Sequence, residues 1–521
     1  MTKYLLILIV IIAAFLRLYN IIPPVGGLPP GLYPDEAMNG NNALEAISTR
    51  DYKVFYPENN GREGLFINIQ ALSIALFGNF PWALRIVSAI FGILTVLGIY
   101  FLAKEIFNKN IALLSAFLLA TSFWHINFSR IGFRAIMAPF FLTWGIYFLL
   151  KSLNNWKLEI GNWKLPILGG LAYGLGFHSY IAYRATPLLI LIIIALYWFQ
   201  NKKWETRKKI LLTASGYILM AIIVFAPLGI YFIQNPQDFM GRTTQVSVFS
   251  SPTPIKDLTM NILKTTSMFN FSGDWNWRHN YAGKPLLFWP VGIFFIIGII
   301  LGIRQLFKFQ MPSAKSQTIF NNQNPNNQNL SSLKFRISNL FEICNLRFVI
   351  LFAWLIIAAL PVVISNEGLP HALRAILMVP PVFILAGFGG IWMYEKILAT
   401  INSSKINLLH WGVAIFIIIL IIQSYQSYFI DWGKNPNVQG AFAADYVQIG
   451  RELNKLPKKT PKYVIVEAGG ADVRGIPMPT QTIMFITDTF TPKKQKEKNI
   501  FYILPDKINQ IPQNSYTVIL K

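Results

Sequence analysis

The chain has 521 residues, of which 54% are hydrophobic and only 13% are charged, and its mean hydropathy is +0.44. Soluble proteins carry about 25% charged residues, so this composition excludes an entirely water-soluble enzyme. Lysine and arginine number 46 against 23 for aspartate and glutamate, and they lie in loops between apolar blocks. The net charge of +23 therefore indicates membrane topology and anionic lipids rather than a nucleic-acid partner. The single cysteine, Cys344, excludes an intramolecular disulfide and a multi-cysteine metal site.

The apolar blocks predict a polytopic α-helical membrane protein. The first block, residues 4–18, follows Lys3 and has no small-residue cleavage site behind it, so we expect a retained anchor rather than a signal peptide. Further helices are expected near residues 81–103, 111–126, 134–150, 165–178, 185–200, 210–233, 285–303, 348–364, 375–394 and 408–430. The total of about eleven is odd, so the two termini should face opposite sides of the membrane.

Basic residues give this path an orientation. Each loop that the path places inside carries lysine or arginine: Lys104, Lys109, Lys151, Lys157, Lys164, Lys202, Lys203, Arg207, Lys208, Lys209, Arg304, Lys308, Lys396 and Lys405. The positive-inside rule therefore predicts a multi-pass plasma-membrane protein with a cytoplasmic N-terminus. The inner segment 304–347 includes an asparagine- and glutamine-rich run at 321–329, which is too polar to bury a core and is expected to be a linker.

Three long segments are expected outside: residues 20–80 and 234–284 within a membrane domain of residues 1–430, and the tail 431–521. The tail alternates a helix (441–456), a strand (463–466), a helix (480–486) and two strands (501–504 and 516–520). This alternation predicts a small extracytoplasmic α/β domain. Its Gly469-Gly470 pair lacks the spacing of a nucleotide-binding loop and is interpreted as turn glycines.

No Walker loop, H-E-x-x-H, C-x-x-C or G-x-S-x-G motif is present, so the motifs give no support to an ATP-driven pump, a zincin or an α/β-hydrolase. Histidines and arginines gather instead at the predicted outer helix ends: His125, His178, His279, His371, Arg130, Arg134, Arg184, Arg278 and Arg374. Lipid-headgroup anchoring would account for any single one of them. Together they favour an outer anion pocket, because guanidinium groups bind phosphate bidentately.

An acidic pair, Asp35-Glu36, follows Pro34 at an expected helix start. Such a pair stabilises the helix dipole, so capping alone would explain it. Downstream, Arg62-Glu63-Gly64-Leu65 leads into an apolar stretch ending at Gly78, and Arg85 then opens a helix of small and apolar residues. The order of these pieces, rather than the acidic pair by itself, carries the functional interpretation.

In this order the sequence resembles the protein O-mannosyltransferases and the lipid A aminoarabinose transferases, that is, glycosyltransferase family 39 and its relatives in the GT-C superfamily. The resemblance covers residues 1–150 by motif and the whole chain by topology. The chain departs from it at residues 62–65, where the relatives carry His-Pro-Pro-Leu or Lys-Pro-Pro-Leu. Arg62 can still supply the positive charge of the motif. Glu63 adds an acid where the relatives have proline, so the pocket, and with it the donor sugar or metal use, is expected to differ. Segments 273–280 and 367–375 are similar to uncharacterised bacterial members of the family.

The resemblance implies a GT-C type membrane glycosyltransferase with an outer α/β domain. It would move a sugar from a polyprenyl-phosphate-linked donor to a hydroxyl of a protein, lipid or glycan acceptor, in protein or cell-envelope glycosylation. Asp35 matches the family's catalytic acid and would be the general base, with Glu36 orienting it or the acceptor. The candidates for the donor phosphate are Arg62, Arg85, Arg130 and Arg134. The candidates for sugar or acceptor binding are Glu63, His178, Tyr180, Arg184, Trp275, Trp277, Arg278, His279, Glu367, His371 and Arg374.

No obligatory metal is expected, although Asp35, Glu36 and Glu63 could hold a divalent cation, Mg²⁺ or Mn²⁺, against a phosphate. The main alternative is a transporter or flippase for a lipid-linked sugar. Transporters usually place ionisable residues near the bilayer midplane, whereas the helix centres here are almost free of them. A non-enzymatic anchor for the tail would leave most of the helices without a use.

Overall fold

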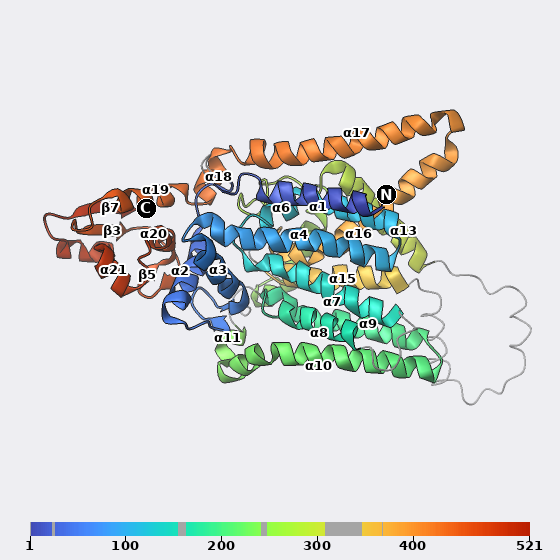
Figure 1. Cartoon of the computed structure of the whole chain (residues 1–521), viewed down its shortest axis with the longest axis horizontal. Helices are drawn as coiled ribbons and strands as arrows, with labels where there is room; N and C mark the ends of the chain where they lie inside the picture. The colour runs from blue at the N-terminus through green and yellow to red at the C-terminus, as the bar shows by residue number, and fades with distance from the viewer. Residues whose placement is uncertain (1, 23–26, 155–162, 241–246, 308–345, 367) are drawn as a thin grey trace, which may run out of the picture.

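The structure, a computed structural model, describes residues 2–22, 27–154, 163–240, 247–307, 346–366 and 368–521. A bundle of long helices forms one part of the molecule, and a small α/β domain extends from one end of it (Figure 1). Predictions that concern Cys344, Glu367 and the asparagine-rich run lie outside the described residues.

Eight helical segments of the described chain are long and apolar enough to cross a membrane. They are α4 (Pro81–Ile106), α7 with a preceding 3₁₀ turn (Arg134–Asn154), α9 with its own turn (Ile181–Gln200), α10 (Trp204–Gln234), α13 (Trp289–Leu306), α15 (Leu346–Val363), α16 with its turn (Arg374–Thr400) and α17 with flanking turns (Ser403–Trp432). Each coincides with an expected helix, so the multi-pass prediction is confirmed. The other three expected helices are shorter: α1 (Thr2–Leu18), α5 (Lys109–Ala120) and α8 (Lys164–Gly176). The total of eleven spans therefore stays a prediction.

The break after α5 has a local cause. The sequence predicts one helix over 111–126, but α5 ends at Ala120 and a separate α6 (Phe123–Phe128) follows. The buried Arg17 guanidinium donates to the carbonyls of Ala120 at 3.0 Å and Leu119 at 3.3 Å. These last carbonyls of α5 have no partner within their own helix, so the arginine satisfies them where the chain turns.

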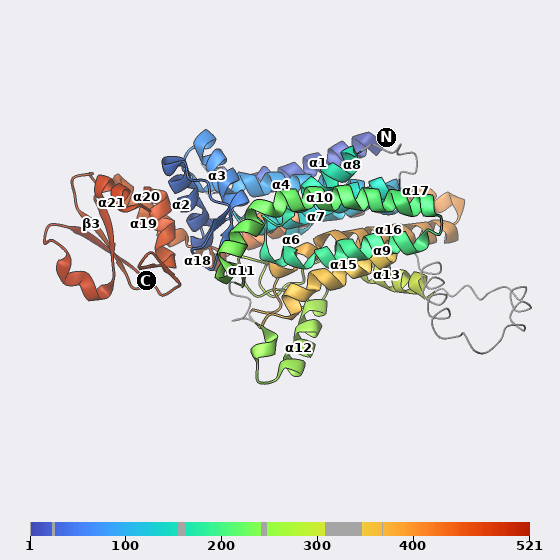
Figure 2. The same ribbon diagram turned by 90° about the horizontal axis from the view of Figure 1, so that it is seen from below.

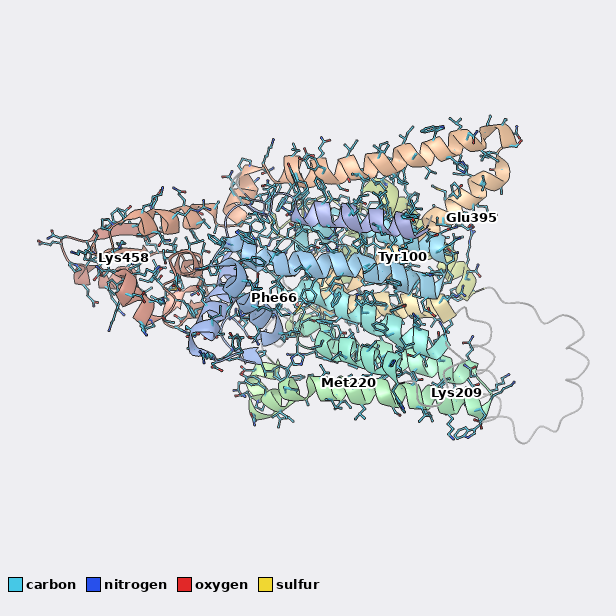
Figure 3. All side chains as sticks on the ribbon, viewed as in Figure 1. Phe66, Tyr100, Lys209, Met220, Glu395 and Lys458 are labelled. Atoms are coloured by element: carbon cyan, nitrogen blue, oxygen red, sulfur yellow. The ribbon has the colours of Figure 1, made fainter. Side chains whose placement is uncertain are left out.

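One end of the bundle carries the α/β domain, and the other end lies away from it (Figure 1). Lys209 and Glu395 lie at the end away from the α/β domain, which carries Lys458 (Figure 3). The N-terminus of α1 lies at that same far end (Figure 1). The arrangement agrees with the predicted path of the chain, and the assignment of this end to the cytoplasm stays a prediction.

The first long connection folds into α2 (Pro34–Thr49), a two-residue antiparallel ribbon of β1 (Phe55–Tyr56) and β2 (Arg62–Glu63), and α3 (Gly64–Phe77). Pro34 occupies the first turn of α2, where a missing N–H costs nothing. The second connection contains α11 (Pro236–Met240), a short 3₁₀ turn and α12 (Pro254–Ser267), which projects away from the bundle (Figure 2). The sequence analysis did not predict α3 or α12.

The α/β domain follows α17 and its π-helical extension (Gln426–Trp432). Its three-stranded sheet has the order β6-β3-β7 and both pairings are parallel, with Lys462 opposite Ile500 and Tyr516. The elements are α18 (Pro436–Ala441), α19 (Ala444–Lys455), β3 (Lys462–Val466), β4 (Asp472–Val473), β5 (Ile476–Pro477), α20 (Gln481–Thr487), α21 (Pro492–Lys498), β6 (Ile500–Ile503) and β7 (Tyr516–Leu520). All three expected strands and both expected helices are present.

The α/β domain packs directly on α2. Phe485 of α20 is fully buried in an apolar cluster that includes Ala37 and Ala43 of α2. Gly40 makes this approach possible, because a Cβ there would lie 2.4 Å from the Phe485 ring. At the rim, the Arg474 guanidinium donates to both carboxylate oxygens of Glu45, at 2.9 and 2.8 Å, and to Glu58 at 2.7 Å. Apolar packing and ion pairs together fix the domain over the first connection.

Replacing Phe485 with alanine should loosen this contact. Truncation of a buried phenylalanine costs about 3 to 5 kcal/mol, so Phe485→Ala should lower the unfolding temperature in detergent and speed proteolytic release of the domain. The control is Ile519→Ala in β7, whose side chain is 47% exposed. Equal protease resistance of the two variants would contradict the packing of the domain on α2.

Candidate active site

A pocket of about 680 Å³ lies between the first connection, the loop that carries Arg278 and the α/β domain. Its lining includes Tyr33, Asp35, Asn59, Arg278, Asp445 and Tyr446. The predicted base and the predicted arginine of the second connection thus meet in one cavity. The α/β domain supplies Asp445, Tyr446 and the Gly469-Gly470 turn on the opposite side.

Asp35 is half-buried in the wall of this pocket. Asn59 donates its side-chain amide to Asp35 Oδ1 at 2.5 Å, and Asn59 itself has a left-handed backbone with φ of 53°. The Arg278 guanidinium lies over the Tyr33 ring at 3.8 Å. Burial, together with the Asp35 charge, raises the pKa of Tyr33 to about 12. Among the described residues Asp35 forms no ion pair, so its carboxylate faces the pocket lining without a fixed counter-ion.

Glu36 has a different environment from its neighbour. It is fully buried and forms a bidentate ion pair with Arg85, at 2.9 and 3.0 Å, while the Gly132 amide donates to it at 2.7 Å. Arg85 also donates to the carbonyls of Pro29 and Gly31. Each guanidinium nitrogen of Arg85 is thus engaged in the interior. The pair therefore has a structural role in the interior, where Arg85 has no nitrogen left for a phosphate, and the orienting role of Glu36 stays a prediction.

Arg130 is also an interior residue. It is fully buried and donates to the carbonyls of Arg17 at 2.8 Å and Leu28 at 2.9 Å. The rings of Tyr428 and Phe429 lie 5.3 and 5.0 Å from its guanidinium carbon. Arg130 therefore binds the C-terminal end of α1 and the chain beyond it, rather than lining the pocket expected for the donor phosphate.

Three of the remaining predicted arginines, Arg62, Arg134 and Arg184, form a cationic cluster with Glu63. Arg134 Nε lies 2.8 Å and Arg184 Nη2 lies 3.7 Å from the Glu63 carboxylate, and both arginines stay about one-fifth exposed, at 21% and 23%. Arg62 is buried and donates to Asn39 at 2.8 Å and Asn42 at 2.5 Å. The cluster of Arg62, Glu63, Arg134 and Arg184, called here the Glu63 cluster, has three cations for one anion.

Electrostatics connects the Glu63 cluster with the Asp35 pocket. Burial and the nearby Arg134 charge lower the pKa of Arg62 to about 10, while the Asp35 charge acts in the opposite direction. Arg62 therefore lies within the electrostatic range of both Asp35 and Arg134. Tyr180 is similarly within range of Arg134 and Arg374. Asn59, which donates to Asp35, and Arg62 of the Glu63 cluster lie three residues apart in the chain.

A third group consists of Asp274, His279 and His371. The two imidazole rings stack with centroids 4.8 Å apart, and His279 Nδ1 lies 3.1 Å from Asp274 Oδ2. Asp274 also accepts hydrogen bonds from the amides of Asn276 and Ala372, each at 2.8 Å. Burial, with the His279 and Arg374 charges, lowers the pKa of His371 to about 3, so this imidazole is neutral at physiological pH.

Of the side chains that the structure describes, these three alone form a group of acids, histidines or cysteines close enough to share a metal ion. The carboxylates that could hold a divalent cation by sequence, Asp35, Glu36 and Glu63, form no such group among the described residues, and Glu36 and Glu63 are each paired with arginine. The prediction that no metal is obligatory stays a prediction. The Asp274 group already satisfies its carboxylate with protein donors and fixes its loop to the loop around Ala372.

The other predicted sugar-binding residues are dispersed. His178 Nε2 is hydrogen-bonded to the Val224 carbonyl at 3.0 Å. Trp275 is 69% exposed and packs on Gly283, whereas the Trp277 carbonyl accepts a hydrogen bond from Trp432. Neither tryptophan lines the Asp35 pocket.

Sequence reasoning missed several residues of the site. Asn39, Asn42 and Asn59 position Arg62 and Asp35, and Asp445 and Tyr446 complete the pocket. The signal available was the run Asn39-Gly40-Asn41-Asn42, because polar side chains on a helix that also packs against an apolar cluster need partners inside the protein.

Known proteins resemble this chain in sequence and in fold. Residues 65–231 match the family model of dolichyl-phosphate-mannose-protein mannosyltransferases. Archaeal oligosaccharyltransferase AglB from Archaeoglobus fulgidus, solved with an inhibitory peptide and a dolichol-phosphate, has a TM-score of 0.51 over 93% of this chain and 63% of its own, at 15% identity. The chain has the GT-C fold. This finding confirms the resemblance to GT-C glycosyltransferases predicted from the sequence.

Two further matches agree with the GT-C fold. An A. fulgidus oligosaccharyltransferase tethered to an acceptor peptide gives a TM-score of 0.52 over 98% of this chain and 65% of its own, at 13% identity. YkcB of Bacillus subtilis (strain 168), provisionally named as a mannosyltransferase, is 24% identical over 229 residues, which are 42% of this chain and 29% of YkcB. The GT-C chain described here thus spans less than a third of that curated relative's length and less than two thirds of the archaeal enzymes.

The buried pair of Glu36 and Arg85 should be important for stability. Removing one partner of a buried ion pair commonly costs about 3 to 5 kcal/mol, because the other charge is left uncompensated. Glu36→Gln should therefore lower the unfolding temperature of the purified protein well below that of Glu467→Gln, which changes an exposed glutamate of the α/β domain. Similar melting curves for these two variants would refute the structural role of Glu36.

Proposed function

We propose that this GT-C protein is a membrane glycosyltransferase that uses a polyprenyl-phosphate-linked sugar and acts at the face of the membrane that carries the α/β domain. The observation that carries the proposal is the position of Asp35: an unpaired carboxylate in an open pocket, with the cationic Glu63 cluster nearby. The family match is to mannosyltransferases, which favours a hexose donor. The acceptor is a hydroxyl of a protein, lipid or glycan.

Asp35 is the proposed general base. A carboxylate within hydrogen-bond distance of the acceptor hydroxyl can take its proton as the oxygen attacks the anomeric carbon. The bond from that carbon to the phosphate oxygen then breaks, and the polyprenyl phosphate leaves with the electron pair. Asn59 is a positioning residue, because its amide fixes one carboxylate oxygen of Asp35 at 2.5 Å.

The Glu63 cluster is the proposed site for the donor phosphate. The leaving phosphate gains negative charge in the transition state, and fixed cations stabilise that charge without rearrangement. Arg134 and Arg184 keep part of their surface accessible, whereas Arg85 and Arg130 are buried and occupied by protein acceptors. The phosphate role therefore moves from Arg85 and Arg130 to Arg134 and Arg184, with Arg62 behind them.

The α/β domain is proposed to contact the acceptor. Asp445, Tyr446 and the Gly469-Gly470 turn line the same cavity as Asp35. An acceptor that occupies this cavity next to Asp35 would contact them. The solved archaeal oligosaccharyltransferases with an inhibitory or acceptor peptide share the fold, which makes a peptide a reasonable first acceptor to try.

Turnover should depend on Asp35. Purified protein in liposomes is given a panel of polyprenyl-phosphate sugars, and sugar release or transfer is measured for the wild type and for Asp35→Asn. One donor should be consumed, and the variant should lose about a hundredfold or more in rate with an unchanged unfolding temperature. Movement of an intact lipid-linked sugar across the bilayer without its consumption would instead identify a flippase.

Donor binding should depend on the arginines rather than on Asp35. Loss of a hydrogen bond to a charged group costs about 1.5 to 3 kcal/mol, so Arg134→Gln or Arg184→Gln should weaken polyprenyl-phosphate binding at least about tenfold. Asp35→Asn should bind the lipid as the wild type does. Arg50→Gln, at the exposed end of α2, is the control. A loss confined to Arg85→Met, with Arg134→Gln unaffected, would refute the assignment.

A further inference from the structure

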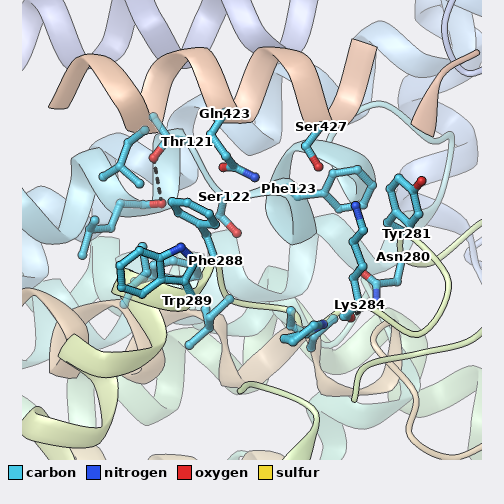
Figure 4. A pocket seen from close by; sticks show the side chains of 17 residues that line it. Thr121, Ser122, Phe123, Asn280, Tyr281, Lys284, Phe288, Trp289, Gln423 and Ser427 are labelled. Atoms are coloured by element: carbon cyan, nitrogen blue, oxygen red, sulfur yellow. Dashed lines mark hydrogen bonds between the residues drawn. The ribbon is translucent and has the colours of Figure 1, made fainter. Parts of the chain in front are cut away.

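Two adjoining cavities lie on the opposite side of the Arg278 loop, between that loop and α17. Their volumes are about 300 and 360 Å³, and both are lined by Lys284, Phe288, Gln423 and Ser427. In Figure 4, Gln423 and Ser427 extend from the helix toward the side that holds Lys284, Phe288 and Trp289. None of these residues lines the Asp35 pocket, so the cavities form a separate site, called here the α17 groove.

Two charged residues of the α17 groove, Lys284 and Asp431, have no ion-pair partner among the described residues. Lys284 Nζ lies 3.6 Å from the centre of the Tyr281 ring, and no carboxylate of the described chain is within ion-pair distance of it. Asp431, which lines the second cavity, likewise has no basic partner among the described residues. The groove thus presents one cation and one anion that the protein itself does not pair.

The π-helical turn after α17 places these groups. Within Gln426–Trp432, the side chains of Tyr428, Phe429 and Trp432 are buried against the bundle. Gln426, Ser427 and Asp431 of the same turn line the groove instead. π-Helical turns are rare and are found mostly at functional sites.

Much of the remaining lining of the groove is apolar. Phe288, Ile419 and Ile422 belong to it, and only 6% of the 18-residue apolar window of the α17 span is buried inside the protein. A span with so little protein contact is surrounded by lipid over most of its surface. Trp289, which begins α13 and is 68% exposed, also lines the groove. An exposed tryptophan at a helix end is typical of the level of the headgroups.

We propose that the α17 groove binds a zwitterionic aminophospholipid, such as phosphatidylethanolamine. The phosphate would pair with Lys284, the ammonium group with Asp431, and the acyl chains would lie along the apolar face of α17. A lipid of this kind has a partner for the cation, for the anion and for the apolar surface of the groove. An anionic lipid without an amine would leave Asp431 without a partner. The inference does not depend on the proposed transferase activity.

Lipid at Lys284 would also stabilise the Arg278 loop. Lys284 lies at the base of this loop, where its carbonyl accepts a hydrogen bond from Asn280 at 2.6 Å. The Gly283 amide donates to the Asp274 carbonyl at 3.0 Å and closes the loop. The same loop carries Arg278 into the Asp35 pocket. Fixing its base therefore restricts the position of Arg278.

Lipid binding to the full-length protein tests the proposal directly. Delipidated protein receives equal amounts of phosphatidylethanolamine and phosphatidylglycerol, and native mass spectrometry gives the Kd of each. A partly exposed ion pair contributes up to about 1 kcal/mol, or roughly a fivefold change in Kd. The wild type should therefore bind phosphatidylethanolamine up to about fivefold more tightly than phosphatidylglycerol.

Three variants separate the contributions. Lys284→Gln should weaken both lipids by a similar factor, and Asp431→Asn should abolish the preference between them. Lys264→Gln, at an exposed site on α12, should change neither Kd. Unfolding temperatures near that of the wild type exclude misfolding as a cause. Equal binding of both lipids by the wild type, or no effect of Lys284→Gln, would overturn the proposal.

Discussion

The ion pair between Glu36 and Arg85 is the constraint on which the rest of the site depends. It connects the start of α2 to α4, and through the Gly132 amide it also reaches the segment before Arg134. A carboxylate with no exposed surface is stable only with such partners. Because Asp35 precedes Glu36 in the chain, the same pair sets where the unpaired carboxylate lies. One residue of the acidic pair is thus a fixed internal support, and its neighbour is left accessible.

The α/β domain belongs to the site as much as the bundle does. Its apolar contact through Phe485 and its ion pairs through Arg474 fasten it over α2, and the Asp35 pocket is the space left between the two parts. The same contacts therefore stabilise the position of the domain and shape the pocket. A substitution that shifts the domain alters the pocket wall even when it is far from Asp35 in the sequence.

The sequence predicts the membrane helices and their order well. The bilayer, and not the contacts between distant segments, sets the pattern of apolar blocks and basic loops. Asp35 is predicted as the base because its neighbours follow the order of motifs that the family shows, and the structure places it in a pocket. The arginines divide in a way that the sequence does not reveal: Arg85 and Arg130 are occupied by carbonyls and a buried glutamate, whereas Arg134 and Arg184 keep accessible surface. Whether a guanidinium meets a ligand or a helix end depends on contacts between distant segments, and the roles of Asn39 and Asn42 depend on such contacts too.

The length of the α17 span has a mechanical consequence. Its 30 residues would measure about 45 Å as a straight helix, which exceeds a hydrocarbon core of about 30 Å, so the span either extends beyond the core or tilts within it. Figure 1 shows it running obliquely beside the bundle and ending next to the α/β domain. Where the helix tilts, a thicker bilayer brings it more upright and moves its end along the membrane normal. Since Arg474 and Phe485 hold the domain to α2, such a movement would act on the wall of the Asp35 pocket.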